Sequence, residues 1–134
     1  MNNFSEEISI RKFKTEDFPL LQRLYNQEGW MTFINRPEEA LKAWENSNPA
    51  LVCTYGSKII GLVRGLTDGE ITTYIAEIIV DNEYRKKGIG KALLDECHNL
   101  YPHTRFDLLA TEEADKFYRN NGFRSSTGFR RSFY

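Results

Sequence analysis

The 134-residue sequence is poor in the residues that build disulfides and metal sites. Its two cysteines, Cys53 and Cys97, form no Cys-x-x-Cys pair, so we expect two buried free thiols in a reducing compartment. His98 and His103 lack the spacing of metal ligands, and no metal is expected. No apolar run approaches the ~20 residues that cross a bilayer, and residues 1–5 show no signal-peptide pattern. These absences favour a cytoplasmic protein without a membrane partner.

The sequence also has no excess of positive or of negative charge. The 18 Lys and Arg residues against 19 Asp and Glu residues give a formal net charge of -1. This balance argues against a nucleic-acid partner, because there is no general surplus of positive charge to attract phosphates. A small local anion site is still compatible with it. The 40% apolar and 13% aromatic content predicts a buried core in a single domain, residues 1–134.

Hydrophobic periodicity predicts alternating strands and helices. Strands are expected at 6–13, 50–55, 58–66, 71–81 and 104–111, with a final strand or strand pair at 123–134. Helices are expected from Phe18 to Gly29, from Arg36 to Asn46, from Ile89 to Cys97 and over 112–121. The resulting order, β-α-α-β-β-β-α-β-α-β with one optional further β, predicts an α/β fold in which helices cover a mixed sheet.

Residues 78–94 are the most informative segment. A buried strand leads into a basic glycine loop and then into an amphipathic helix. Backbone amides at a helix start lack intrahelical partners and lie at the positive end of the dipole, so they suit a phosphate. Gly88 and Gly90 would let an anion approach the backbone, and Arg85, Lys86, Lys87 and Lys91 add positive charge. The spacing matches neither a P-loop nor a dinucleotide fingerprint, and a solvated basic turn is the alternative interpretation.

Two motifs carry a resemblance to a known family. Arg85-Lys86-Lys87-Gly88-Ile89-Gly90 resembles the acyl-coenzyme A signature Arg/Gln-x-x-Gly-x-Gly/Ala of the GNAT (Gcn5-related N-acetyltransferase) superfamily. Residues 114–123 are similar to the family's Ala-x-x-Phe-Tyr-x-x-x-Gly-Phe helix. The resemblance covers nearly the whole chain. It implies a GNAT-like mixed, mostly antiparallel central sheet flanked by helices, and an enzyme that moves an acetyl group from acetyl-CoA to a primary amine by direct attack in a ternary complex.

The resemblance also implies individual roles. The pyrophosphate of coenzyme A would be held by Arg85, Lys86, Lys87, Gly88, Ile89, Gly90 and Lys91. Ile78, Ile79 and Val80 would pair with the pantetheine arm in a cleft between their strand and the strand at 106–110, and one of their amides would polarise the thioester carbonyl. Tyr118 corresponds to the tyrosine proposed to protonate the departing thiolate, and a core aromatic beside Phe117 is the alternative.

The proton acceptor for the amine is less clearly indicated. Glu77 is the only acidic residue within the apolar strand, which makes it a candidate general base. An ion pair with a neighbouring base such as Arg64 is an equally consistent interpretation. Asp107 on the next strand is a weaker candidate, and bulk water would suffice for a weakly basic amine.

The acceptor and the partners stay open at this level. By analogy with the family, the acceptor side would be lined by Tyr25, Trp30, Phe33, Arg64 and Tyr74, with core packing as the alternative for each aromatic residue. The acceptor itself is either a small-molecule amine or a protein N-terminus or lysine. A non-catalytic acyl-CoA-binding sensor or regulatory module is the alternative function. The protein is expected to be a monomer or a homodimer, since residues 127–134 could complete the sheet or exchange with a partner.

Overall fold

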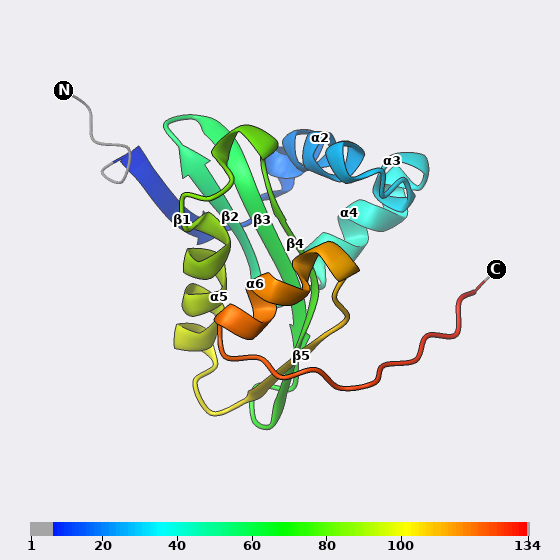
Figure 1. Ribbon diagram of the computed structural model, residues 1–134. Coiled ribbons are helices and arrows are strands. Elements are labelled where there is room, and N and C mark those ends of the chain that lie inside the picture. Colours follow the sequence, from blue (N-terminus) through cyan, green and yellow to red (C-terminus); the bar gives the residue numbers. More distant parts are fainter. Residues whose placement is uncertain (1–6, 134) are drawn as a thin grey trace.

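A five-stranded sheet forms the centre of the computed structural model, which describes residues 7–133 (Figure 1). The strands lie side by side in sequence order: β1 (Ile8–Lys12), β2 (Ala50–Tyr55), β3 (Lys58–Thr67), β4 (Thr72–Val80) and β5 (Arg105–Leu108). Strands β1 to β4 are antiparallel to their neighbours, and β5 runs parallel to β4. The prediction of a mixed, mostly antiparallel sheet is therefore confirmed.

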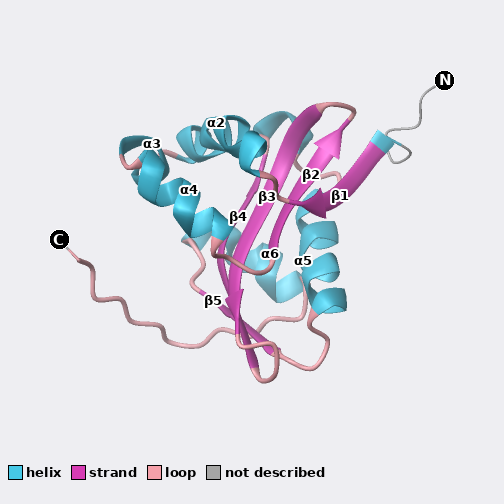
Figure 2. Ribbon diagram, turned by 180° about the vertical axis from the view of Figure 1, so that it is seen from behind, coloured by secondary structure: helices cyan, strands magenta, loops and turns pink. Residues whose placement is uncertain are grey.

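Helices cover both faces of this sheet (Figures 1 and 2). One face carries α2 (Phe18–Glu28), α3 (Thr32–Asn35) and α4 (Pro37–Glu45), preceded by the 3-10 turn η1 (Thr15–Asp17). The other face carries α5 (Ile89–Leu100) and α6 (Asp115–Asn120), each preceded by a 3-10 turn, η2 (Asn82–Tyr84) and η3 (Glu112–Ala114). None of the helices in residues 7–133 is long and apolar enough to cross a membrane.

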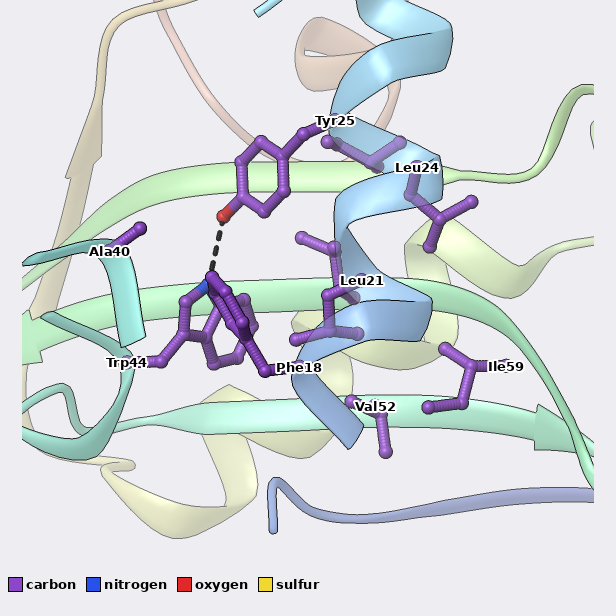
Figure 3. Close-up of a cluster of buried hydrophobic side chains, with 10 residues drawn as sticks. Phe18, Leu21, Leu24, Tyr25, Ala40, Trp44, Val52 and Ile59 are labelled. Carbon is purple, nitrogen blue, oxygen red and sulfur yellow. Dashed lines mark hydrogen bonds between the residues drawn. The ribbon is translucent and has the colours of Figure 1, made fainter. Parts of the chain in front are cut away.

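The two faces bury two separate apolar clusters, because successive strand residues point to opposite sides. Val52 of β2 packs with α2 and α4, whereas Leu51 and Cys53 pack with α5 and α6. On the α2 side, apolar residues at helical spacing are buried together with residues of α4 and of the sheet (Figure 3): Phe18, Leu21, Leu24, Tyr25, Ala40, Trp44, Val52 and Ile59. Figure 3 also shows the Trp44 indole N–H donating a 3.1 Å hydrogen bond to the Tyr25 hydroxyl.

Two predicted strands differ from the structure. The strand expected at 104–111 is confined to β5, because its pairing with β4 ends at Leu108. The final strand expected at 123–134 is wrong for residues 123–133, which form neither helix nor strand. Within the described chain no neighbouring strand lies against them, and a β-ladder needs such a partner. Residue 6 of the first predicted strand and residue 134 lie outside the described residues.

A β-bulge interrupts β4 at Ala76. Arg64 opposes Glu77 whereas Gly65 opposes Ile75, so Ala76 is an extra residue on β4. The bulge changes which side chains face which helices: Ile75 packs on the α5 side, whereas Glu77 and Ile79 face α2. The sheet pairing between β4 and β5 ends at the same level, with Ile75 opposite Leu108. The strand β4 thus continues from the bulge to Val80 without β5 beside it.

Candidate active site

The predicted pantetheine strand lies where β4 and β5 part. Ile78, Ile79 and Val80 follow the bulge and have β3 on one side only. A strand edge without a neighbour presents backbone N–H and C=O groups that an extended ligand can pair with. The side chains of Ile78 and Val80 also pack against the apolar cluster under α5 and α6, so this stretch of β4 adjoins that side of the sheet.

The glycine loop ends at the N-terminus of α5, as the sequence predicted. Gly88 is the N-cap residue in a left-handed conformation, φ 83°, and Lys86 is also left-handed, φ 64°. The first backbone bond of the helix runs from the Ala92 N–H to the Gly88 carbonyl. Among residues 7–133, the N–H groups of Ile89, Gly90 and Lys91 find no acceptor. This helix start therefore offers unsatisfied donors at the positive end of a 12-residue helix, a suitable place for a phosphate group.

Two of the cationic side chains predicted for this anion site form ion pairs within the chain. Arg85 forms a 2.9 Å ion pair with Glu28 on α2. Lys91 donates a 2.6 Å bond to Asp95, one turn along α5. Both cations still raise the local potential, but their nearest charges are carboxylates. Two of the four predicted cations of the loop are thus ion-paired, whereas the backbone amides of Ile89, Gly90 and Lys91 have no acceptor among the described residues.

Gly90 also has a packing role that the sequence did not predict. A Cβ atom on Gly90 would lie 3.0 Å from Cζ of Phe117, closer than an ordinary contact. The glycine therefore allows α6 to pack on the first turn of α5. Gly88, by contrast, has no atom within 4 Å of a Cβ position and is required by its positive φ.

Residues of α2 that the sequence did not predict hold the end of β4 and the two residues after it in place. Arg23 forms a 2.8 Å ion pair with Asp81, the residue after β4. Gln27 donates from Nε2 to the Val80 carbonyl, 3.1 Å, and its Oε1 accepts the Asn82 N–H, 2.9 Å. Burial opposes the charge on Asp81, yet bonds from the Glu83 N–H and Arg23 hold the pKa of Asp81 below its ordinary value. The only sequence signal was a lone aspartate directly after an apolar strand.

Tyr118 lies on the same side of the sheet as Ile78 and Val80. Its ring is buried edge-on against Phe117 and Phe123, with centroids 5.1 and 5.5 Å away. The described residues provide no hydrogen-bond partner for its hydroxyl, and none of their fully buried side-chain oxygens or nitrogens is unpaired, so this hydroxyl reaches the surface. Burial of the ring raises the pKa of Tyr118 to about 12. The phenol is therefore protonated at neutral pH and has a free O–H to donate.

Glu77 is held by three donors on the opposite face of the sheet. The Tyr25 hydroxyl donates to Oε1 at 2.6 Å, and Arg64 donates to both carboxylate oxygens, Nε to Oε1 and Nη2 to Oε2, each at 2.7 Å. The Arg64 and Glu77 side chains are each only 14% exposed. The ion pair left open by the sequence is therefore present in the structure. Burial disfavours the charge on Arg64, but the bonds and charge of Glu77 outweigh it and raise the pKa of Arg64.

Three of the five predicted acceptor-side residues lie together at this ion pair: Arg64 itself, Tyr25 and Phe33. The Phe33 ring stacks on Tyr25 with centroids 4.0 Å apart and planes 3° from parallel, and the Arg64 guanidinium lies 5.2 Å from the Phe33 ring centroid. Tyr25 is fully buried, so core packing is its correct interpretation, and burial next to Glu77 raises its pKa. Trp30 is 36% exposed, and Tyr74 lies before the bulge. Among residues 7–133, neither side chain forms a hydrogen bond to Tyr25, Arg64 or Glu77.

Neither thiol is suited to nucleophilic chemistry. Cys53 and Cys97 are buried free cysteines, as expected, and burial raises their pKa to about 11 and about 12. A thiolate is the reactive form, and these shifts disfavour it. In the described part of the chain, no group of three or more His, Cys, Asp or Glu side chains is placed to hold a metal ion.

The comparison with known families settles the classification. A family model described as the acetyltransferase (GNAT) domain matches residues 46–125, which include β4, the glycine loop and α6. The chain belongs to the GNAT family. A GNAT relative from Arabidopsis thaliana, "GCN5-related N-acetyltransferase 2, chloroplastic", is 32% identical over 69 residues, or 49% of this chain and 27% of the relative. The chain thus spans about a quarter of that relative's length.

Solved GNAT structures share the whole architecture. A GNAT family acetyltransferase from Streptococcus pneumoniae is 26% identical with a TM-score of 0.74, covering 93% of this chain and 96% of that one. An aminoglycoside acetyltransferase from an uncultured soil sample, solved with sisomicin, is 21% identical with a TM-score of 0.74 and covers 98% of both chains. The latter likeness concerns the fold alone.

The GNAT site of this chain is compatible with acetyl-CoA, the acyl donor of the family. The unpaired amides of Ile89, Gly90 and Lys91 fit a pyrophosphate, which needs several donors in one place. The free edge of β4 fits an arm that carries amide groups of its own. Both features belong to the region that the GNAT model matches.

Proposed function

We propose that this protein transfers the acetyl group of acetyl-CoA to a primary amine, which attacks the thioester directly in a ternary complex. One arrangement carries the proposal. The unpaired amides at the start of α5, the stretch of β4 that has no strand on its outer side, and the free hydroxyl of Tyr118 all adjoin the apolar cluster under α5 and α6. An anion site, an extended binding edge and a proton donor are what a thioester carrier of this kind needs from a protein.

The binding roles follow from backbone groups. The N–H groups of Ile89, Gly90 and Lys91 would hold the pyrophosphate, and Ile78 to Val80 would pair with the pantetheine arm. Acetyl-CoA supplies an acetyl group activated as a thioester. A backbone N–H of this strand that donates a hydrogen bond to the thioester carbonyl oxygen stabilises the negative charge that grows there during attack. Such a preorganised donor is worth about 10²-fold or more in rate.

Tyr118 would act on the sulfur that leaves. Its pKa of about 12 exceeds the ordinary thiol value of about 8.5, so complete proton transfer to a free thiolate is uphill. A hydrogen bond from the phenol to the developing thiolate is favourable without that transfer. Tyr118 would therefore serve as a donor that stabilises the departing sulfur, and solvent completes its protonation.

Glu77 would accept the amine proton through a water molecule. Its Oε1 already accepts two hydrogen bonds and its Oε2 accepts one, so an open acceptor position is left on Oε2. Arg64 and Tyr25 fix the carboxylate in one orientation, which suits a proton relay with defined geometry. The proton then passes from the attacking nitrogen to water and on to the carboxylate.

One observation favours the non-catalytic alternative, an acyl-CoA-binding sensor or regulatory module. A carboxylate that already holds three donors has a sufficient structural role without any chemistry. In that case the protein binds acetyl-CoA, and no amine increases the release of free thiol.

The test is an amine panel with two readouts. Acetyl-CoA is incubated with the protein and with polyamines, amino acids, aminoglycosides, a lysine peptide or a peptide with a free N-terminus. Free thiol is measured continuously, and the acetylated product is identified by mass spectrometry. Amine-dependent thiol release with a matching product supports the transferase. Saturable acetyl-CoA binding without such release supports the sensor, and absence of acetyl-CoA binding contradicts both.

A further inference from the structure

Trp44 lies at the buried end of a hydrogen-bond chain that reaches Glu77. Its indole N–H donates to the Tyr25 hydroxyl at 3.1 Å, and that hydroxyl donates to Glu77 Oε1 at 2.6 Å. The first of these bonds joins α4 to α2 (Figure 3). Trp44 is 1% exposed and Tyr25 is fully buried, so neither offers a surface to an acceptor amine. The chain thus connects the core under α4 to the candidate base on β4.

The direction of this chain is fixed by the chemistry of its groups. An indole N–H can only donate, whereas a phenol has one proton to donate and lone pairs that accept. Because Trp44 donates to the Tyr25 oxygen, the Tyr25 proton points to the carboxylate. Burial, together with the charge and the bond of Glu77, raises the pKa of Tyr25, so this proton stays on the phenol. The bond from Trp44 acts on that pKa in the opposite direction and makes the phenol a stronger donor to Glu77.

Tyr25 is the group that distinguishes the two oxygens of Glu77. Arg64 donates to Oε1 and to Oε2 at the same distance, 2.7 Å, so the guanidinium treats the two oxygens alike. Arg64 is itself held independently of Trp44, because its Nη1 donates to the Ser47 hydroxyl at 3.2 Å. The Tyr25 hydroxyl adds a second donor to Oε1 alone. A carboxylate oxygen accepts about two hydrogen bonds, so Oε1 is filled and Oε2 keeps an open position.

Packing alone does not account for the bond that the Trp44 indole makes. The ring fills the apolar cluster under α2 and α4 and lies 4.9 Å from the Phe13 ring, between centroids. A buried indole N–H needs a partner, and most side-chain hydrogen bonds in proteins go to backbone groups or water. Here the N–H bonds instead to the hydroxyl that holds Glu77.

We propose that Trp44 is a positioning residue for acetyl transfer, which acts through Tyr25 to fill Glu77 Oε1 and to direct the amine proton to Oε2. This inference rests on the proposed function, in which Glu77 accepts that proton through a water molecule. As the amine nitrogen bonds to the acetyl carbon, its N–H bond breaks, the proton passes to the water, and a water proton passes to Oε2. Without the bond from Trp44, the Tyr25 hydroxyl is free to rotate and is a weaker donor. Oε1 then competes with Oε2 for the water, and the relay loses its single geometry.

The first test removes the Trp44 N–H and keeps the ring. Trp44→benzothienylalanine has sulfur in place of the N–H in a ring of nearly the same shape, so the core stays filled. We expect kcat to fall about tenfold with unchanged acetyl-CoA affinity, because only the orientation of the base is lost. Added buffer bases should restore part of the rate, since they take the proton without the relay. Thr73→Val is the matched control, because it also removes the bonds of a fully buried side chain, to the Thr67 and Thr104 hydroxyls, and should keep full kcat.

The second test asks whether Trp44 acts through Tyr25. Tyr25→Phe alone should lower kcat at least as much as the Trp44 variant, because it removes the donor to Oε1 itself. Adding the Trp44 change to Tyr25→Phe should then cost no further kcat, since the two residues act along one chain. Two losses that multiply in the double variant would show that Trp44 acts by another route, and they overturn the proposal.

The outcomes also separate this inference from the proposed function. If the wild type releases no thiol with any amine, the proposed function fails and this inference fails with it. If the wild type turns over and the Trp44 variant does so at the same rate, only this inference fails. A Trp44 variant in which acetyl-CoA affinity falls together with kcat indicates a general disturbance of the fold, which contradicts a positioning role.

Discussion

The ring of Phe117 lies directly over Gly90, so close that a Cβ atom on Gly90 would come within 3.0 Å of Phe117 Cζ. This contact joins the first turn of α5, which offers the unpaired amides, to α6, which carries Tyr118 at the next position. The anion site and the proposed proton donor therefore depend on one packing contact. A change on either side of it alters the position of the other.

Gly90→Ala is expected to move α6 outwards. The added methyl group overpacks the contact and costs about 1 to 3 kcal/mol of stability. Because Tyr118 moves with α6, kcat should fall more than the affinity for acetyl-CoA. Phe117→Leu in the same chain makes room for the methyl group and should restore both stability and kcat, measured by thermal unfolding and steady-state kinetics. If acetyl-CoA binding is lost and the second change does not restore it, the glycine serves the ligand instead.

Tyr118→Phe removes the free hydroxyl and keeps the buried ring. We expect kcat to fall about 10²-fold, in the lower part of the range for proton-donor residues, with nearly unchanged acetyl-CoA affinity. Since the pKa of Tyr118 is about 12, the wild-type rate should show no alkaline limb from this group below about pH 11. Tyr101→Phe, at the end of α5, is the control. Unchanged turnover in Tyr118→Phe would remove the residue from the chemistry.

Glu77→Gln separates chemistry from structure. It leaves the Arg64 guanidinium buried without its partner, and the unfolding free energy should drop by about 3 kcal/mol, the lower end for a broken buried pair. Replacing both residues, Glu77→Gln with Arg64→Met, removes the unpaired charge and should recover most of that stability.

Activity should not recover with stability if Glu77 accepts the amine proton. The double variant is then folded but slow, and its rate rises with added buffer bases that replace the relay. Recovery of full kcat in the stable double variant would instead assign the carboxylate a purely structural role.

The lowered pKa of Asp81 predicts that the protein loses stability at acidic pH. Its pKa in the folded protein lies below the ordinary value of 3.8, so its stabilising contribution is complete above that value and is lost as the pH falls through the folded pKa. The urea midpoint of the wild type should therefore decline from about pH 5 downwards more steeply than that of Asp81→Asn. Arg23→Gln removes one of the bonds that lower this pKa and should reduce the same slope. Identical slopes in all three proteins would contradict the assignment.

Much of the fold was predictable because its signals are local in the chain. The periodicity of apolar residues predicted the strands β1 to β5 and the longer helices, because each element buries apolar side chains on one face or on both. The glycine loop was predicted at the start of α5, because a basic glycine stretch lies between a buried strand and an amphipathic helix in the sequence. The structure adds that Gly88 adopts a positive φ there. The predicted strand at 123–133 failed for the complementary reason: a strand exists only when another strand pairs with it.

The details of the candidate site depended on contacts between distant parts of the chain. The sequence identified Glu77 as unusual but could not choose between a base and an ion pair, because that choice depends on where Arg64 and Tyr25 lie. The bonds from Arg23 and Gln27 to the end of β4 had only Asp81 as a sequence signal, since polar residues on a helix are ordinarily solvated.

The sequence by itself determined the order of elements from β1 to α6, the loop that precedes α5 and the family, because these follow from residue types at short spacing. Only the tertiary structure decided the bulge at Ala76, the parting of β4 from β5 and the role of Gly90 against Phe117. Those features arise when the register of one strand and the packing of one helix are set by neighbours far away in the chain. Short-range patterns specify which surface each element buries, whereas the partner it meets there is chosen by the packing of the whole domain.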